Sequence, residues 1–390
     1  MTGECILATG MGVISALGDS VAETDAAFLR PAAPPVLSPF ADHGLSVPVF
    51  RVENVAHSDD VSRTVTLARH AATKALAQAR IGQFWNSARV GVCIGTTVAS
   101  QINDIPFYEN MRRTGVVDRA AVTRYRNSNV AEALARAFGA TGPRLTICNA
   151  CSSGADALGT ARSWLRAGLC DIAIAGGADE LSRLPLCGFK ALGVYSAEHC
   201  RPFDRDRSGL NIGEAAGIMI LETETHAVAR GATALCELAG YGAANDAHHL
   251  TAPHPDGDGL FRAIHCALRD ASVSPSDIAF INAHGTATPD NDRIEGHTLA
   301  RVFGGHAPVV STKGWTGHTL GAAGAIEAVF TVMGINEGRI PGTAGLQTRD
   351  PDIPVHVSPE PQAVAGDCAI STSLAFGGCN AALVFRRARG

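Results

Sequence analysis

Residues 145–160 read LTICNACSSGADALGT, which joins a short apolar run to a stretch with helical spacing. Residues 145–148 predict a strand, and the apolar positions Ala155, Leu158 and Leu165 predict a helix over residues 152–167. Cys151 lies on the turn where that helix begins. Because a strand followed directly by a helix is the repeating unit of α/β proteins, this stretch predicts an α/β fold.

The same alternation of strands and helices continues along the chain. Strands are predicted over residues 5–9, 90–95, 172–175, 279–283, 309–311, 369–372 and 381–385, and helices over residues 61–79, 130–138, 259–270 and 321–336. Strand-to-helix units lie on both sides of residue 230 with no clear linker between them. We therefore expect two similar α/β halves, residues 1–230 and 231–390, packed into one body.

The composition excludes several classes of protein. The 390 residues include 32 Lys and Arg against 37 Asp and Glu, a net charge of -5, and 46% are apolar, so the chain is neither disordered nor a basic nucleic-acid binder. The apolar stretch 321–335 is interrupted by Glu327 and is shorter than the roughly 20 residues of a membrane helix. Residues 1–18 lack the pattern of a secretory signal, and the 11 cysteines suit a reducing cytoplasm, where we expect this protein to lie.

A glycine pair near the start resembles a dinucleotide-binding fingerprint. Gly10 and Gly12 follow an apolar strand, but a proline-rich stretch arrives where the fingerprint needs a helix, a second strand and an acidic residue. We expect these glycines to turn the chain and not to bind a nucleotide.

The pair Cys148 and Cys151 forms a CxxC sequence with several interpretations. It could be a redox pair, half of a zinc site or two core residues, although no second CxxC supplies further zinc ligands. Alternatively, Cys151 alone is a nucleophile, because a helix N-terminus lowers the pKa of a thiol. A nucleophilic cysteine needs histidine partners from elsewhere in the chain.

Two of the 14 histidines are candidates for that role. His284 follows the predicted strand 279–283, and His318 lies in the run of small residues KGWTGHTLGAAG over residues 313–324. α/β folds place their sites at such strand ends. The pair His248 and His249 is weaker, since nothing around it favours a metal over a solvated loop.

These motifs together resemble a β-ketoacyl-(acyl-carrier-protein) synthase with a Cys-His-His active site, a condensing enzyme of the thiolase fold. The resemblance runs nearly from end to end, and its motifs occur in the family's order. They are TGMGV (9–13), ACSSG (150–154), RPFD (201–204) leading to GE (213–214), DAHHLTAP (246–253), the His284 motif, residues 313–324 and FGGCN (376–380).

The resemblance implies a layered α-β-α-β-α body and a decarboxylative condensation. Cys151 would take an acyl chain from a carrier-protein thioester, and the carbanion from malonyl-carrier protein would attack it. His284 and His318 would stabilise the enolate through their ring N–H groups. The backbone N–H groups of Cys151 and Phe376 would hold the second oxyanion.

The family's other positions carry over residue by residue. Lys313, one of only three lysines, and its expected acidic partner Glu295 would tune the histidines. Thr286 and Thr288 would bind the pantetheine arm, and Phe376 would be the gate beside Cys151. Residues 246–251, which begin with Asp246, and Asn380 would be positions in the neighbouring mobile loops. The family implies no metal and no resident cofactor, because the phosphopantetheine arrives on the acyl carrier protein.

The partners and the chain length stay open. The carrier protein is acidic, so Arg63, Arg112 and Arg113 are candidate docking residues. A homodimer is expected, or a heterodimer in which this chain is the active subunit beside a chain-length partner. A partner subunit without a nucleophile, a thiolase that uses Cys379 and a thiol-disulfide protein are the remaining alternatives. Residues 101–129, expected to line the acyl pocket and the dimer contact, differ from a housekeeping fatty-acid enzyme, and the pathway, fatty acid or specialised polyketide, is undecided.

Overall fold

The described residues of the computed structural model, 4–53, 55–56, 58–98 and 104–388, contain one mixed sheet of ten strands. In chain order these strands are β1 (Ile6–Ile14), β4 (Val90–Gly95), β5 (Arg144–Ile147), β6 (Ile172–Asp179), β8 (Ala215–Thr223), β9 (Cys236–Asn245), β10 (Ile278–Asn282), β11 (Val309–Val310), β14 (Cys368–Ala375) and β15 (Cys379–Arg387). Their order across the sheet is β11-β10-β14-β15-β9-β1-β8-β6-β4-β5.

The sheet is the same five-stranded arrangement made twice. In the first half, β1 pairs antiparallel with β8, β8 pairs antiparallel with β6, and β6, β4 and β5 are neighbours that run parallel. In the second half, β9, β15, β14, β10 and β11 repeat this arrangement in the same order. The two first strands, β1 and β9, join the halves through the pairs Leu7↔Glu237 and Ala8↔Cys236. The prediction of two similar α/β halves in the fold is therefore confirmed.

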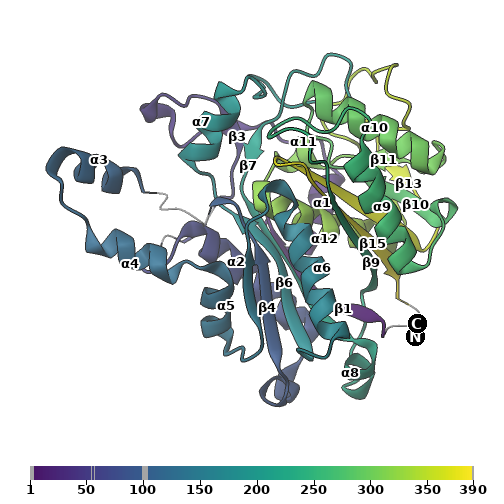
Figure 1. The fold of residues 1–390 in the computed structure, drawn as a ribbon, viewed down its shortest axis with the longest axis horizontal. Coiled ribbons are helices and arrows are strands. Elements are labelled where there is room, and N and C mark those ends of the chain that lie inside the picture. The colour runs from purple at the N-terminus through teal and green to yellow at the C-terminus, as the bar shows by residue number, and fades with distance from the viewer. Residues whose placement is uncertain (1–3, 54, 57, 99–103, 389–390) are drawn as a thin grey trace.

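Helices form three layers around and between the halves of the sheet (Figure 1). The helices α2 (Arg63–Ala79) and α5 (Val130–Phe138) cover the outer face of the first half, and α9 (Asp258–Ala271) with α10 (Pro289–Phe303) covers the second. Between the halves lie α6 (Ser153–Arg166) and α12 (Ala323–Glu337). Because sheets enclose α12 on both sides, residues 323–335 of this helix are buried around its whole circumference and are mostly apolar, and Glu327 is the one charged residue among them.

The two central helices meet at glycines. A Cβ atom at Gly154 would lie 2.8 Å from the carbonyl oxygen of Gly321, and one at Gly324 would lie 2.9 Å from the Cβ of Ala155. Each helix follows a short turn of 3-10 helix whose first residue, Ala150 or Leu320, has a positive φ angle. The small residues thus allow the N-terminal ends of the two helices, one from each half, to come together.

Smaller elements complete the chain. They are α1 (Val21–Phe28), β2 (Val36–Leu37), β3 (Pro48–Phe50), α3 (Ile105–Thr114), α4 (Arg119–Asn127), α7 (Arg183–Ala191), β7 (Ile212–Gly213), α8 (Glu224–Ala229), α11 (Lys313–Thr316), β12 (Arg339–Ile340) and β13 (Gln362–Ala363). Helices α3 and α4 form an arm that extends away from the sheet (Figure 1). Among the described residues, no helix has both the length and the hydropathy needed to cross a membrane.

Every predicted strand and helix has a counterpart in the structure, but two strands of the ten-stranded sheet were missed and one interpretation was wrong. The missed strands, β8 and β9, are central in the sheet. Gly10 and Gly12 do not turn the chain, because β1 continues through them to Ile14. Cβ atoms at these glycines would lie 2.1 Å from the carbonyl oxygens of Ala75 and Ala71, so the glycines let α2 pack directly on the strand.

Candidate active site

The site forms where the C-terminal ends of strands from both halves meet, beside the N-terminus of α6. The turn after β5 carries Cys151, and the chain after β10, β11 and β14 carries His284, residues 313–318 and Phe376. The C-terminal edge of parallel strands is where α/β folds place their ligands.

Hydrogen bonds fix the turn that carries Cys151. Ala150 has φ +48°, and the Ser153 hydroxyl accepts from the Asn149 N–H (2.8 Å) and donates to the Ala150 carbonyl (2.6 Å). The Ser152 hydroxyl donates to the Asp156 carboxylate at 2.8 Å. The turn therefore holds Cys151 in one position, with 6% of the residue exposed.

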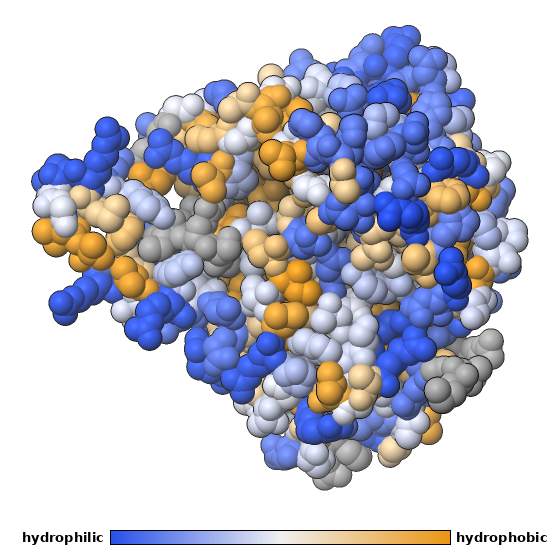
Figure 2. All heavy atoms as spheres, in the orientation of Figure 1, coloured by the Kyte–Doolittle hydropathy of each residue, from blue (hydrophilic) through white to orange (hydrophobic). Residues whose placement is uncertain are grey.

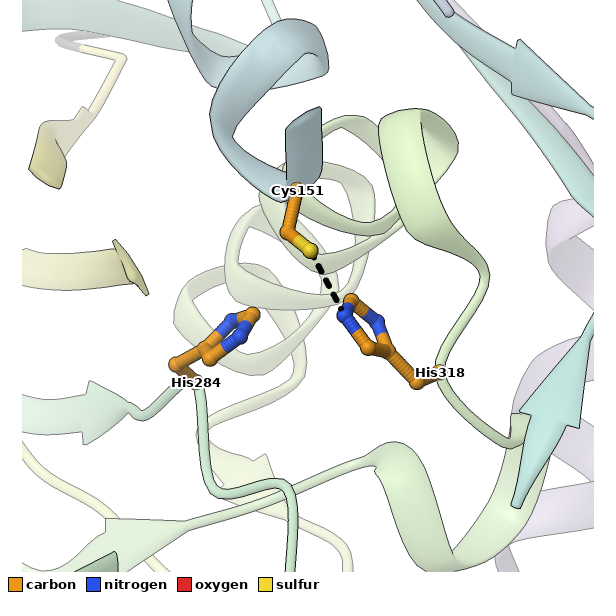
Figure 3. A group of neighbouring side chains, drawn as sticks. All are labelled: Cys151, His284 and His318. Carbon is orange, nitrogen blue, oxygen red and sulfur yellow. Dashed lines mark hydrogen bonds between the residues drawn. The ribbon is translucent and has the colours of Figure 1, made fainter. Parts of the chain in front are cut away.

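Two histidines from the other half of the chain face this cysteine (Figure 3). Nε2 of His318 lies 2.9 Å from Sγ of Cys151. The ring of His284 lies 5.1 Å from that of His318, centroid to centroid, and nearly perpendicular to it at 88°. The fold thus brings together the three residues that the sequence singled out.

A buried lysine lies behind the histidines. Nζ of Lys313 lies 3.1 Å from Nδ1 of His284 and forms a very short ion pair with Glu327. An ammonium group can only donate hydrogen bonds, so Nδ1 of His284 accepts and the ring proton of the neutral imidazole is on Nε2. Nδ1 of His318, in contrast, is buried and has no hydrogen-bond partner among the residues that the structure describes.

The prediction that Glu295 is the acidic partner of Lys313 is wrong, because its oxygens are occupied elsewhere. Glu295 accepts from the backbone N–H groups of His284 and Gly285, both at 2.8 Å, and from the Thr372 hydroxyl at 2.8 Å. It therefore orients the backbone at His284. The partner of Lys313 is Glu327, which the sequence analysis noted only as an interruption of an apolar stretch. The signal that could have identified it is that Glu327 is the only charged residue in the apolar stretch 321–335.

Burial dominates the protonation states. Burial raises the pKa of the Cys151 thiol to about 12, against the opposing effects of the Lys313 charge and a hydrogen bond from the Phe376 N–H. Burial of the resting thiol thus opposes the lowering of its pKa that was expected from the helix N-terminus. Burial, together with the charge of Lys313, lowers the pKa of His284 and of His318 well below the usual range, so both rings are neutral. Burial also raises the pKa of Glu327 to about 7.

A cavity of about 340 Å³ leads to this group. Its lining includes Cys151, His284, His318, Phe376, Thr286, Thr288, Asp246 and Asn380, which are all the predicted site residues except Lys313 and Glu295. The hydroxyls of Thr286 and Thr288 lie 2.9 Å apart on one wall. The lining also includes the apolar side chains of Phe189, Leu192 and Val194.

Two loops at the cavity are linked by hydrogen bonds. The Asn380 amide donates to Asp246 at 2.8 Å, the Asp246 N–H donates to the Gly378 carbonyl at 2.8 Å, and the Gly377 N–H donates to the Leu250 carbonyl at 2.7 Å. These contacts join residues 246–250 to residues 377–380, so a movement of one loop would require a movement of the other.

The competing cysteines are not part of this site. Cys148 is exposed, whereas Cys151 is buried against His318. Cys379 does not line the cavity, and its sulfur accepts a hydrogen bond from the Asn245 side chain instead. These placements do not support the redox pair or a second catalytic cysteine of the thiolase kind.

The three central side chains also form a group that could hold a metal ion. Their donor atoms lie within 4.8 Å of one another. The ammonium of Lys313 keeps the proton of His284 on Nε2, however, and a protonated nitrogen cannot be a ligand. The arrangement favours acid–base chemistry at a thiol over metal binding.

The candidate docking arginines differ in their surroundings. Arg63 forms an ion pair with Glu214 at 2.8 Å and donates to the Val52 carbonyl, so it is a structural residue. Arg112 and Arg113 are exposed on α3. Of the stretch 101–129, residues 101–103 lie outside the described residues, and the remainder forms the arm of α3 and α4.

Comparison with known proteins identifies matching family models and similar relatives. The chain matches the model "Beta-ketoacyl synthase, N-terminal domain" over residues 50–227 and "Beta-ketoacyl synthase, C-terminal domain" over residues 235–347. It is 41% identical over 261 residues to the 3-oxoacyl-(acyl-carrier-protein) synthase 2 of Synechocystis sp. and 39% identical over 260 residues to that of Staphylococcus aureus. Each match covers 64% of this chain but only 63% of the relative, so the aligned region spans less than two thirds of these proteins.

Solved structures are similar over nearly the whole chain. The ishigamide ketosynthase/chain length factor superimposes with a TM-score of 0.92 at 31% identity, covering 99% of this chain and 100% of that one. A type II polyketide synthase acyl-carrier protein in complex with its ketosynthase superimposes with a TM-score of 0.91 at 28% identity, again covering 99% of this chain and 100% of that one. A ketosynthase in complex with its chain length factor from Xenorhabdus doucetiae superimposes with a TM-score of 0.86 at 30% identity, covering 99% of this chain and 98% of that one.

Proposed function

Because the chain belongs to the β-ketoacyl synthase family, we propose that it catalyses the decarboxylative condensation of a Cys151-bound acyl chain with a malonyl thioester. The observation that carries this proposal is the 2.9 Å contact between Sγ of Cys151 and Nε2 of His318, with the perpendicular ring of His284 beside it.

In the first step, Cys151 takes the acyl group from a carrier thioester. The raised pKa of the thiol means that its proton must leave as sulfur attacks. Nε2 of His318 is within reach to accept this proton and to give it to the departing carrier thiol. The S–acyl bond of the carrier breaks as the S–acyl bond of Cys151 forms, so charge and protons balance.

In the second step, the bond from the malonyl group to its carboxylate breaks and releases carbon dioxide. The electron pair forms an enolate, whose oxygen needs hydrogen-bond donors. His284 supplies an N–H at Nε2 because Lys313 occupies Nδ1. His318 can supply a second donor, since its Nδ1 has no partner that would fix the other tautomer. The enolate carbon then attacks the acyl-cysteine, the Cys151 thiolate leaves, and the thiolate takes up a proton from solvent through Nε2 of His318.

An acyl carrier protein delivers both substrates in this proposal, and the enzyme holds no resident cofactor. The support is the carrier complex of the similar ketosynthase and the cavity, which has two threonine hydroxyls on one wall and Cys151 in its lining. A reducing compartment such as the cytoplasm suits a reaction that needs Cys151 as a free thiol.

A second chain is proposed to pair with the edge strand β5. This strand is the last in the sheet, and its Leu145 is 42% exposed. The arm adds five exposed apolar side chains among charged ones (Figure 2); they are Tyr108, Met111, Val116, Val117 and Tyr125. A homodimer is the first candidate. A heterodimer with this chain as the active subunit is the second, because two of the similar structures are ketosynthases with chain length factors.

The test combines product mass with assembly state. The purified chain is incubated with malonyl-carrier protein and a panel of acyl-carrier proteins, and the products are weighed by mass spectrometry. A β-ketoacyl product two carbons longer than the acyl primer supports the proposal, and its absence with every primer and with a co-expressed chain length factor contradicts it. Light scattering of the chain alone separates the homodimer from a monomer that requires another subunit.

A further inference from the structure

The short helix α11 needs outside support to hold Lys313. It has only four residues, Lys313–Thr316, and the side chain of its N-cap residue, Thr312, makes no capping hydrogen bond. A helix of one turn has no stability of its own. Neighbouring segments must therefore fix the position from which Lys313 reaches His284.

A segment from the other half of the chain contacts α11 directly. Nε2 of His199 lies 2.6 Å from the carbonyl oxygen of Gly314. Since a carbonyl can only accept, the imidazole N–H of His199 is the donor. The next residue, Cys200, donates its S–H to the carbonyl of Lys313 at 3.4 Å. The ring of His199 packs edge-on against Phe50, with 5.6 Å between the centroids.

Asn211 connects the same segment to the second histidine. Its Oδ1 accepts from the N–H of Cys200 at 2.8 Å, and its Nδ2 donates to the carbonyls of Ser196 and Glu198. Its own carbonyl accepts from the N–H of His318 at 2.7 Å. Residues 196–200 are thus tied both to α11 and to the backbone that presents His318.

We propose that His199 is a positioning residue for the condensation, acting through the Gly314 carbonyl to hold Lys313 against His284. The inference rests on the proposed function and deepens it. The 3.1 Å contact from Nζ of Lys313 to Nδ1 of His284 fixes the tautomer that donates to the enolate. A displacement of about 1 Å at such a contact can cost on the order of a hundredfold in rate.

Two variants separate the donor from the shape of the ring. His199→Phe keeps a ring against Phe50 but removes the donor to Gly314, whereas His199→Gln keeps an N–H near the position of Nε2. We expect His199→Phe to lower kcat for condensation on the order of tenfold to a hundredfold with the KM for malonyl-carrier protein unchanged. His199→Gln should recover most of kcat.

A second readout does not depend on the reaction. The charge of Lys313 lowers the pKa of the Cys151 thiol, so a displaced lysine shifts the pH profile of alkylation at Cys151 to higher pH. Iodoacetamide labelling is followed by mass spectrometry in a Cys148→Ser background, because Cys148 is exposed on the same peptide. His199→Phe should show the shift, and His199→Gln should not.

The outcomes distinguish the two proposals. A drop in kcat and a shifted alkylation profile for His199→Phe, both reversed in His199→Gln, support the positioning role. If the wild-type protein does not catalyse condensation, the proposed function is contradicted. A difference in the alkylation profile of Cys151 between wild type and His199→Phe would still support the role of His199 in positioning Lys313. The inference would be overturned if wild type and His199→Phe, at matched thermal unfolding midpoints, had equal kcat and equal alkylation profiles. It would also be overturned if His199→Phe and His199→Gln lowered kcat to the same extent.

Discussion

Nζ of Lys313 lies 3.1 Å from Nδ1 of His284, and both groups are buried. This contact distinguishes the two histidines. Lys313 fixes His284 as a donor through Nε2, whereas the unpartnered Nδ1 of His318 leaves that ring able to accept or donate at Nε2. The geometry therefore assigns His318 to the proton of Cys151 and reserves His284 for the enolate.

Replacing Lys313 by methionine should affect the two half-reactions differently. Without the ammonium, nothing holds the proton of His284 on Nε2, and we expect decarboxylation to slow on the order of a hundredfold, as when an oxyanion donor is lost. The Lys313 charge also lowers the pKa of His318, so this pKa should rise in the variant. A protonated His318 cannot accept the thiol proton, and acylation should therefore fall as the pH is lowered through the raised pKa.

Single-turnover acylation and decarboxylation of Lys313→Met, each measured from pH 5 to pH 9, check this pair of effects. The double variant Lys313→Met with Glu327→Gln is the control, because it removes the carboxylate that the single variant leaves unpaired. Acylation by the variant that keeps the wild-type pH profile would show that the charge of Lys313 does not reach His318.

Substitutions of His284 should show whether this residue acts as a hydrogen-bond donor to the enolate or as a general base for Cys151. His284→Ala should lower the rate of carbon dioxide release by about 10²- to 10³-fold, the usual effect of losing one donor. Acyl transfer to Cys151 should change little, because His318 is the residue in contact with the sulfur. His284→Gln, whose amide N–H can approach the position of Nε2, should recover part of the decarboxylation. If His284→Ala blocks acylation as strongly as decarboxylation, the division of roles between the histidines is incorrect.

The two cysteines of the CxxC sequence should behave independently. Cys151→Ala should abolish formation of the acyl-enzyme, which intact-protein mass spectrometry detects directly. Cys148→Ser should retain most of it, since Cys148 is exposed and outside the cavity lining. The opposite pattern, with Cys148 essential, would support the thiol-disulfide interpretation.

The local parts of this site were predictable from sequence, because they depend on neighbours in the chain. A strand that ends at a turn and a helix that starts beside Cys151 show in the spacing of apolar residues, and both structures form there. The position of His284 after a predicted strand and of His318 in a run of small residues made them candidates, and the family motifs then supported both. What the sequence could not show was which acid faces Lys313: Glu295 and Glu327 lie on different helices, and only the tertiary packing of α12 places Glu327 against the lysine.

The glycines of β1 are a second example of this limit. Their sequence neighbours favoured a turn, because glycine is frequent in turns. The contact that explains them comes from α2, about 60 residues later in the chain, whose backbone leaves no room for a side chain at Gly10 or Gly12. His199 and Asn211 were missed for the same reason, since their partners lie about a hundred residues away along the chain.

This packing gives a prediction about stability. In an open strand, replacing glycine by alanine would reduce chain entropy in the unfolded state and stabilise the fold slightly. In Gly10→Ala, however, the new Cβ would lie 2.1 Å from the carbonyl oxygen of Ala75, so strand and helix must move apart. We expect the free energy of unfolding in urea to fall by about 1–3 kcal/mol, the usual cost of overpacking. Gly188→Ala is the matched control, because it lies in helix α7 with no heavy atom within 4 Å of the added Cβ and should leave the protein equally or slightly more stable, by up to about 1 kcal/mol. Equal urea midpoints for Gly10→Ala and wild type would show that α2 can shift away from β1 without loss, and that close packing does not account for this glycine.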